Sequence, residues 1–203
     1  MLSKYGPTSR HRCDELLTLH KPEASGHFVQ FYENDGATIE NVAYATAMTL
    51  KDGNSAVIVA TEKHRLAIKA KLAKAGIDVG SALASHRLTM LDAQETLSSF
   101  LVEGWPDSGK FDETVGNVVR QALKDSGNGF VFAFGEMVAL LCAAGRPDAA
   151  VHLERLWNDL GKKHRFSLYC AYPLDCFGTQ PDLEIVLQIC DEHGLSVPAE
   201  GPL

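Results

Sequence analysis

The sequence lacks a long apolar run, an excess of basic residues and a signal-peptide segment. Its longest largely apolar stretch, residues 130–145, is interrupted by Glu136, and the first twenty residues contain no apolar core segment. Lysine and arginine number 19 against 26 aspartates and glutamates, a net charge of −7. A membrane-spanning helix needs about 20 apolar residues, and nucleic-acid binding needs a basic surface. We therefore expect no membrane span, no secretion and no direct contact with nucleic acid.

Paired cysteines are also missing. The five cysteines form no CxxC motif, and no pair of histidines stands at ligand spacing beside them. An odd number of isolated cysteines is typical of a reduced, cytoplasmic chain, and such cysteines do not predict a zinc site. For single histidines such as His27 and His64, a structural role is more frequent than a ligand role. We therefore predict a cytoplasmic protein with no metal site and no cofactor.

Several catalytic and nucleotide-binding motifs are absent as well: GxGxxG, GxSxG and HExxH do not occur. One stretch, Gly104–Phe111, nearly matches the phosphate-binding P-loop. However, Phe111 replaces the Ser or Thr whose hydroxyl would bind Mg²⁺, and a helical segment rather than a strand precedes Gly104. We interpret the match as coincidence. No catalytic residue is predicted, and the chain is not expected to be an enzyme.

Segments typical of strands alternate with segments typical of helices from residue 26 onward. The expected strands span 27–32, 55–60, 87–91, 130–134 and 166–172. Apolar residues at helical spacing predict helices at 39–50, 61–75, 93–103, 111–124, 136–144, 147–160 and 181–193. Strands that are apolar on both faces indicate a parallel sheet covered by helices on both sides. The predicted fold is α/β, a doubly wound, mostly parallel sheet of five or more strands in three layers, with the strands at 55–60 and 130–134 inside it.

In sheets of this kind, ligands bind beyond the carboxyl ends of the strands. Helix N-termini meet there and leave N–H groups free, so polar side chains after each strand are candidates for ligand binding. Six residues occupy such positions: Tyr32, Asp35, Thr61, His64, Asp92 and Glu136. For Asp92 and Glu136 a local role is the alternative, because acids near helix N-termini also stabilise the helix itself.

Seven blocks, taken in order, resemble a known family. They are His27–Tyr32 with Asp35, Val57–Thr61 with His64 and Arg65, Arg87–Ala93, Trp105–Asp107 with Phe111, Phe134–Met137, Leu153–Trp157 and Phe166–Pro173. Together they resemble the MEDS domain, the methanogen/methylotroph sensory domain of a dichloromethane-responsive regulator and of many prokaryotic signalling proteins. The resemblance covers residues 26–178. It implies a RecA-like core, similar to the circadian-clock ATPase fold, that has lost its nucleotide-binding loop. It also implies a sensory role.

The expected organisation has three parts: an N-terminal extension at 1–25 with room for a short helix at 14–20, a MEDS-like domain at 26–178, and a C-terminal helix and tail at 179–203. No kinase or DNA-binding region fits beside the domain. The first hypothesis is therefore a stand-alone signal-input module that binds a small molecule or partner and signals to a histidine kinase or transcription regulator on another chain, with a homodimer left open. The alternatives are a divergent nucleotide-binding or small-molecule enzyme and a protein-interaction adaptor.

Overall fold

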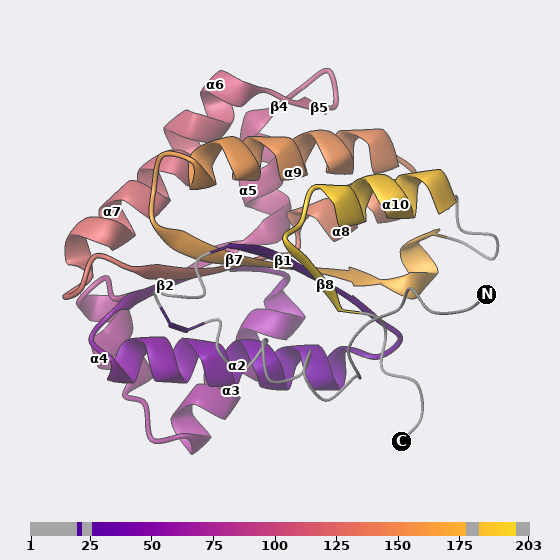
Figure 1. Cartoon of the computed structure of the whole chain (residues 1–203). Helices are drawn as coiled ribbons and strands as arrows, with labels where there is room; N and C mark the ends of the chain where they lie inside the picture. Colours follow the sequence, from indigo (N-terminus) through magenta and orange to yellow (C-terminus); the bar gives the residue numbers. More distant parts are fainter. Residues whose placement is uncertain (1–19, 22–25, 178–182, 198–203) are drawn as a thin grey trace, which may run out of the picture.

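A parallel sheet of six strands forms the middle layer (Figure 1), in the order β3-β2-β6-β7-β1-β8. The strands are β1 (His27–Tyr32), β2 (Ser55–Ala60), β3 (Leu88–Asp92), β6 (Val131–Gly135), β7 (Phe166–Pro173) and β8 (Leu195–Val197). Every neighbouring pair runs parallel. The predicted doubly wound α/β fold is confirmed, and β2 and β6 lie inside the sheet as predicted.

The computed structural model describes residues 20–21, 26–177 and 183–197. For residues 195–197 it describes the backbone alone. Almost all of the short helix expected at 14–20 lies outside this range, as do the first two residues of the helix expected at 181–193. The rest of that last helix is present as α10 (Leu183–Asp191).

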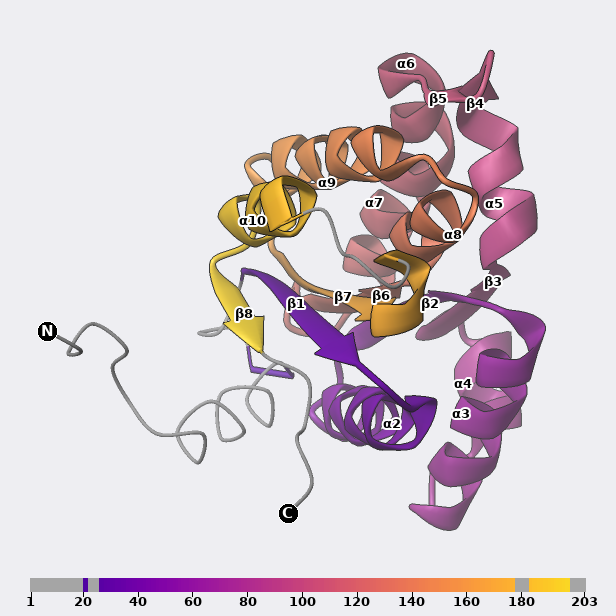
Figure 2. The same ribbon diagram turned by 90° about the vertical axis from the view of Figure 1, so that its right-hand side faces the viewer.

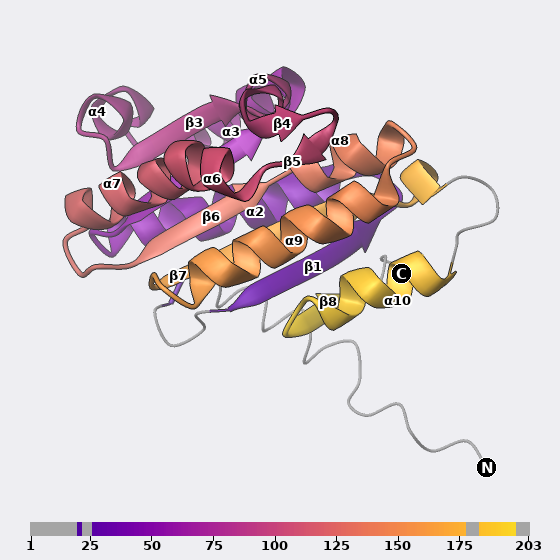
Figure 3. The ribbon, with the colours of Figure 1, turned by 90° about the horizontal axis from the view of Figure 1, so that it is seen from above.

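Helices cover both faces of the sheet, and each face has its own hydrophobic cluster. One face packs against α2 (Asp35–Lys51), α3 (Glu62–Lys74) and α4 (Val79–Ala84). The other packs against α5 (Ala93–Phe100), α7 (Asn117–Asp125), α8 (Met137–Ala143), α9 (Pro147–Gly161) and α10. Figure 3, seen from above, shows these last helices lying over the strands. Alternate residues of β2 enter the two clusters, and all six are buried, because a covered parallel sheet leaves neither face to water.

The segment 93–125 differs from the expectation. The helix predicted to reach residue 103 ends at Phe100, where a small hairpin of β4 (Leu101–Val102) and β5 (Trp105–Pro106) begins. Glu103 and Gly104 make its turn with φ of 49° and 82°, which no helix tolerates. The loop expected at 104–110 therefore contains β5 and α6 (Ser108–Phe111), and a π-helical turn (Asp112–Gly116) joins α6 to α7. The short α4 was not predicted either.

The sheet gains an edge strand that the sequence did not predict. Residues after 193 were expected as a tail, but β8 pairs in parallel with β1, as Figure 2 shows. Three residues are too short for a periodic pattern to indicate a strand. Within the described residues, no helix combines the length and apolar character needed to cross a membrane.

Candidate functional site

The chain leaves the neighbouring strands β2 and β6 toward opposite faces of the sheet. After β2 it enters α3, which packs in one hydrophobic cluster, and after β6 it enters α8, which packs in the other. Such a switch point opens a crevice beyond the carboxyl ends of the two strands. The structure therefore brings the side chains that follow β2 and β6 to one place, as the sequence predicted.

Three of the six predicted residues form a charged triad in this crevice. His64, in the first turn of α3, bonds through Nδ1 to Oε1 of Glu136 and through Nε2 to Oδ2 of Asp35 at 3.0 Å. The side chains of Glu136, His64 and Asp35 are 5%, 11% and 35% exposed, so the triad runs from the interior to the surface. Three segments distant in sequence, the start of α2, the start of α3 and the end of β6, meet at one imidazole.

The triad fixes the protonation of His64. A carboxylate only accepts hydrogen bonds, so both ring nitrogens must carry a proton to bond to Glu136 and Asp35 together. The hydrogen bond to Glu136 is the main cause that raises the pKa of His64 above its ordinary value, and burial opposes it. Hydrogen bonds from Lys63, at 2.5 Å, and from His64 lower the pKa of Asp35. The triad is thus an imidazolium held between two carboxylates.

Glu136 does not cap the helix that follows it. Its Oε2 accepts the backbone N–H of Thr61 at 2.8 Å, and its own N–H donates to Val59 at 3.0 Å, so it is bound to the end of β2. Its backbone lies at φ −106° and ψ 0°, in the sparsely populated bridge region where active-site residues are often found. Glu136 thus makes no capping hydrogen bond to α8, but it stands at the N-cap position, where a negative charge favours the helix dipole, so the helix-stabilising alternative stays open.

That alternative does describe Asp92. Its Oδ1 accepts the N–H groups of Gln94 and Glu95 at 2.9 and 3.0 Å, which caps α5. These backbone hydrogen bonds are the main cause of its lowered pKa. Its other oxygen pairs with Arg65 at 2.7 Å. Asp92 thus borders the crevice through Arg65, and its role in ligand binding stays a prediction.

Tyr32, at the end of β1, lies near the triad. Burial raises the pKa of its hydroxyl, and the negative charges of Glu136 and Asp35 raise it further. The phenol is therefore neutral and keeps its proton for donation. Thr61 contributes its backbone N–H rather than its side chain. Lys63 and Arg65, which flank His64 in the chain, were not among the six predicted residues, yet they pair with Asp35 and Asp92.

Two hollows of the described surface lie away from this crevice. Cavities of about 280 and 220 Å³ lie at the amino ends of the strands. The larger borders His27 and Asn158, and the smaller borders Leu50 and Arg87. In the crevice, the carboxylates of Asp35 and Glu136 are both bonded to His64, so a ligand that binds either carboxylate competes with a pairing of the triad.

Among the residues that the structure describes, one group of side chains that could hold a metal ion lies outside the crevice. The group consists of His27, Glu154, Cys170 and His193, whose possible ligand atoms all lie within 4.8 Å of one another. They come from β1, α9, β7 and the turn after α10. No sequence spacing could indicate this group, because its members are separated by up to 166 positions (193 − 27).

Comparison with known proteins identifies the family. The model of the MEDS domain, the methanogen/methylotroph, DcmR sensory domain, matches residues 26–190. The chain belongs to the MEDS family. The match extends through most of α10, whereas the resemblance in sequence was placed at 26–178. MEDS is a sensory domain family, and this supports a signal-input role for the chain.

Solved structures support the fold. The MEDS chain is similar to a crystal structure of an uncharacterized Pyrococcus horikoshii protein, PH0321, in complex with an unknown peptide. The two share 16% identity over 85% of this chain and 76% of that chain, with a TM-score of 0.58. At this identity the likeness concerns the fold alone. A comparison with curated proteins found no significant match.

Proposed function

We propose that this MEDS domain is a sensory module whose crevice binds a small molecule through Tyr32, Asp35, Thr61, His64, Asp92 and Glu136. The observation that carries the proposal is the His64 imidazolium shared between Asp35 and Glu136. A buried charge is costly unless it is paired, and this one joins three separate segments at the switch point of the sheet. A ligand that competes for either carboxylate would release one of those segments.

The released segment is the signal in this proposal. Asp35 opens α2 and His64 lies in the first turn of α3, two helices that pack against each other on one face of the sheet. Breaking the Asp35–His64 pair would loosen the contact between the first turns of α2 and α3. The output would be a histidine kinase or transcription regulator on another chain, which would recognise the altered helix pair. The RecA-like ancestry of the core is part of the same proposal, and the all-parallel covered sheet supports it.

An enzymatic role is less well supported by the geometry. A general base needs a free lone pair, and both nitrogens of His64 are occupied as donors. Glu136 already accepts hydrogen bonds from His64 and from the Thr61 N–H. We therefore propose recognition without catalysis.

The test begins with native mass spectrometry of the purified chain, which detects a retained small molecule, followed by thermal unfolding with that molecule added. Asp35→Asn removes one charge of the triad at a partly exposed site. The matched control is Glu40→Gln, because Glu40 lies in α2 like Asp35 and forms an exposed ion pair with Lys71 of α3. We expect the ligand-induced rise in Tm to fall in Asp35→Asn and to persist in Glu40→Gln. An unchanged shift in both Asp35→Asn and Glu136→Gln would refute the proposal.

A protein-interaction adaptor is the second candidate, and one observation favours it. Leu183 and Leu187, four residues apart on α10, are 72% and 63% exposed. Residues at this spacing share a helix face, so the two leucines form an apolar surface available to a partner. Replacing both by glutamate would abolish partner binding if the adaptor hypothesis holds, and would leave the ligand response of the crevice intact.

A further inference from the structure

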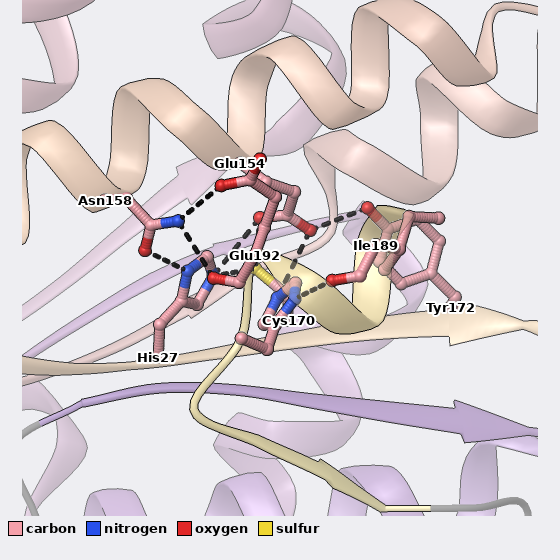
Figure 4. A network of polar contacts seen from close by, with 8 residues as sticks. His27, Glu154, Asn158, Cys170, Tyr172, Ile189 and Glu192 are labelled. Carbon is pink, nitrogen blue, oxygen red and sulfur yellow. Dashed lines mark hydrogen bonds and ion pairs between the residues drawn. The ribbon is translucent and has the colours of Figure 1, made fainter. Parts of the chain in front are cut away.

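A second set of polar side chains lies between the sheet and the α9–α10 layer (Figure 4). His27 begins β1, Glu154 projects from α9, Cys170 lies in β7, and His193 follows α10. Oε2 of Glu154 lies 3.2 Å from Nε2 of His27 and 3.3 Å from Sγ of Cys170. Nε2 of His27 lies 3.3 Å from the same Sγ, and Nε2 of His193 lies 3.4 Å from Oε1 of Glu154. Four side chains from four segments thus converge on one point.

This cluster is buried. The side chains of Glu154 and His193 are fully inaccessible to solvent, Cys170 is 0% exposed, and the side chain of His27 is 9% exposed. An unpaired carboxylate in such a position is strongly disfavoured. The positive charge that balances Glu154 must therefore come from a proton on a neighbouring imidazole or from a cation.

Hydrogen bonds fix the histidine tautomers so that both Nε2 atoms face Glu154. Asn158 donates its amide N–H to the Glu192 carbonyl at 2.8 Å, which turns its oxygen toward Nδ1 of His27 at 2.9 Å. Nδ1 of His193 donates to the Ile189 carbonyl at 2.5 Å. Each Nδ1 therefore carries a proton, and a neutral imidazole then has its lone pair at Nε2.

Glu154 accepts hydrogen bonds from the Cys170 thiol and the Tyr172 hydroxyl, and both Nε2 atoms face its oxygens as well. Nε2 of His193 has no hydrogen-bond partner among the described residues and faces Oε1 of Glu154. Nε2 of His27 faces the other carboxylate oxygen. An imidazole lone pair directed at a carboxylate oxygen repels that oxygen, so each of these contacts needs either a proton on Nε2 or a cation between the two groups.

We propose that His27, Glu154, Cys170 and His193 bind a divalent transition-metal cation, with Zn²⁺ the best match. This departs from the sequence-based prediction of no metal site. Zn–N bonds of about 2.0–2.1 Å and a Zn–S bond of about 2.3 Å place tetrahedral ligand atoms roughly 3.3–3.6 Å apart. Among His27, Cys170 and Oε2 of Glu154 the separations are 3.2–3.3 Å, and all four ligand atoms lie within 4.8 Å of one another, so binding requires a small inward movement of His193. On binding, the Cys170 thiol loses its proton to solvent and becomes the thiolate ligand. Two imidazoles, a carboxylate and a thiolate suit a borderline-soft cation better than Mg²⁺ or Ca²⁺.

The surroundings have the features of a metal site's outer shell. Metal-binding histidines commonly donate their second ring N–H to a carbonyl or carboxylate, and here Asn158 and Ile189 accept these hydrogen bonds. The Tyr172 hydroxyl donates to Oε1 of Glu154 at 2.6 Å and orients that carboxylate. A cavity of about 280 Å³ borders two of these residues, the ligand His27 and its partner Asn158.

The four ligands would make the site a structural clamp with no open position. The ion would tie the turn between α10 and β8 to the central strands, since His193 lies in that turn and Cys170 lies in β7. The MEDS match ends at residue 190, so His193 lies just beyond it. The proposed site therefore joins the family core to the C-terminal edge strand.

The test uses the full, tag-free chain, stripped with a chelator and titrated with Zn²⁺ and Co²⁺. We expect one ion per chain, the visible absorption of tetrahedral Co²⁺, and a thiolate-to-cobalt charge-transfer band. Cys170→Ser should remove the charge-transfer band, and His193→Gln should weaken binding. Asn158→Ala, which changes only the outer shell, should lower the affinity about 10- to 100-fold. The controls are Cys190→Ser and His152→Gln, which leave the cluster intact.

The competing explanation is a metal-free ion pair between Glu154 and a protonated His27. It predicts that the wild-type chain binds no stoichiometric Zn²⁺ or Co²⁺, a result that would overturn the proposal whatever the variants do. Binding that persists unchanged in Asn158→Ala and in a folded Cys170→Ser would overturn it as well. Far-UV circular dichroism of each variant establishes that it is folded before titration.

Discussion

Replacing Glu136 by glutamine should destabilise the protein in a pH-dependent manner. The carboxylate accepts two hydrogen bonds, from the Thr61 N–H at 2.8 Å and from the His64 imidazolium. Glutamine has one acceptor oxygen and one NH₂ group, so one of the two donors would face another donor. A hydrogen bond to a charged group contributes about 1.5–3 kcal/mol, and an unsatisfied buried donor costs about 1–3 kcal/mol, so we expect a loss of about 2–4 kcal/mol in the free energy of unfolding.

The pH dependence follows from His64. Its folded-state pKa is raised, so the stabilisation from the triad is fully present below the ordinary histidine pKa of about 6.5 and is lost as the pH rises through the folded-state value. The cost of Glu136→Gln should therefore be larger at pH 6 than at pH 9. Urea unfolding followed by circular dichroism at the two pH values measures it.

The control is Glu40→Gln, whose carboxylate is 66% exposed in its pair with Lys71. Exposed pairs contribute little, so this variant should stay within about 0.5 kcal/mol of wild type at both pH values. A Glu136→Gln protein as stable as wild type at pH 6, or one with an equal loss at pH 6 and pH 9, would refute the assignment of an imidazolium between two carboxylates.

Three further predictions concern the capping aspartate, the P-loop-like stretch and one close backbone approach. Asp92→Ala should lose about 0.5–2 kcal/mol in urea unfolding, because it removes the cap of α5, whereas Asp92→Asn should retain most of the stability. Mg-ATP should not raise Tm. A ligand that binds the folded chain and is present at 100 times its Kd would add about 2.7 kcal/mol to the free energy of unfolding. A rise in Tm with Mg-ATP that Lys110→Ala abolishes would restore the P-loop hypothesis. Gly127→Ala should cost about 1–3 kcal/mol, because its Cβ would lie 2.9 Å from the Gly53 carbonyl oxygen, whereas Gly80→Ala in α4 should be neutral or stabilising; equal effects would contradict the crowding argument.

Local sequence patterns were sufficient to predict the central strands and most of the helices. The residues of β2 and β6 are apolar on both faces, and this predicts their place inside a covered parallel sheet without any knowledge of their partners. The same patterns placed Glu136 directly after a buried strand and His64 in a first helical turn. Because carboxyl ends of parallel strands share one edge, their meeting could be predicted as well.

The roles of individual acids required the tertiary structure. Asp92 and Glu136 both stand at the N-cap position of the helix that follows a strand, yet Asp92 caps its own helix while Glu136 bonds to Thr61 of another segment. Which donor a carboxylate meets depends on how neighbouring helices and strands pack, and this packing cannot be predicted from the local sequence.

The sequence by itself determined the fold class, the MEDS resemblance and the edge of the sheet where the triad lies, because these depend on periodicity and on chain order. Only the tertiary structure decided the charge state of His64, the addition of β8 to the sheet, and the meeting of Glu154 with Cys170. Each of these depends on contacts between residues far apart in the chain. Such contacts arise from the packing of whole helices and strands, and no local spacing encodes them.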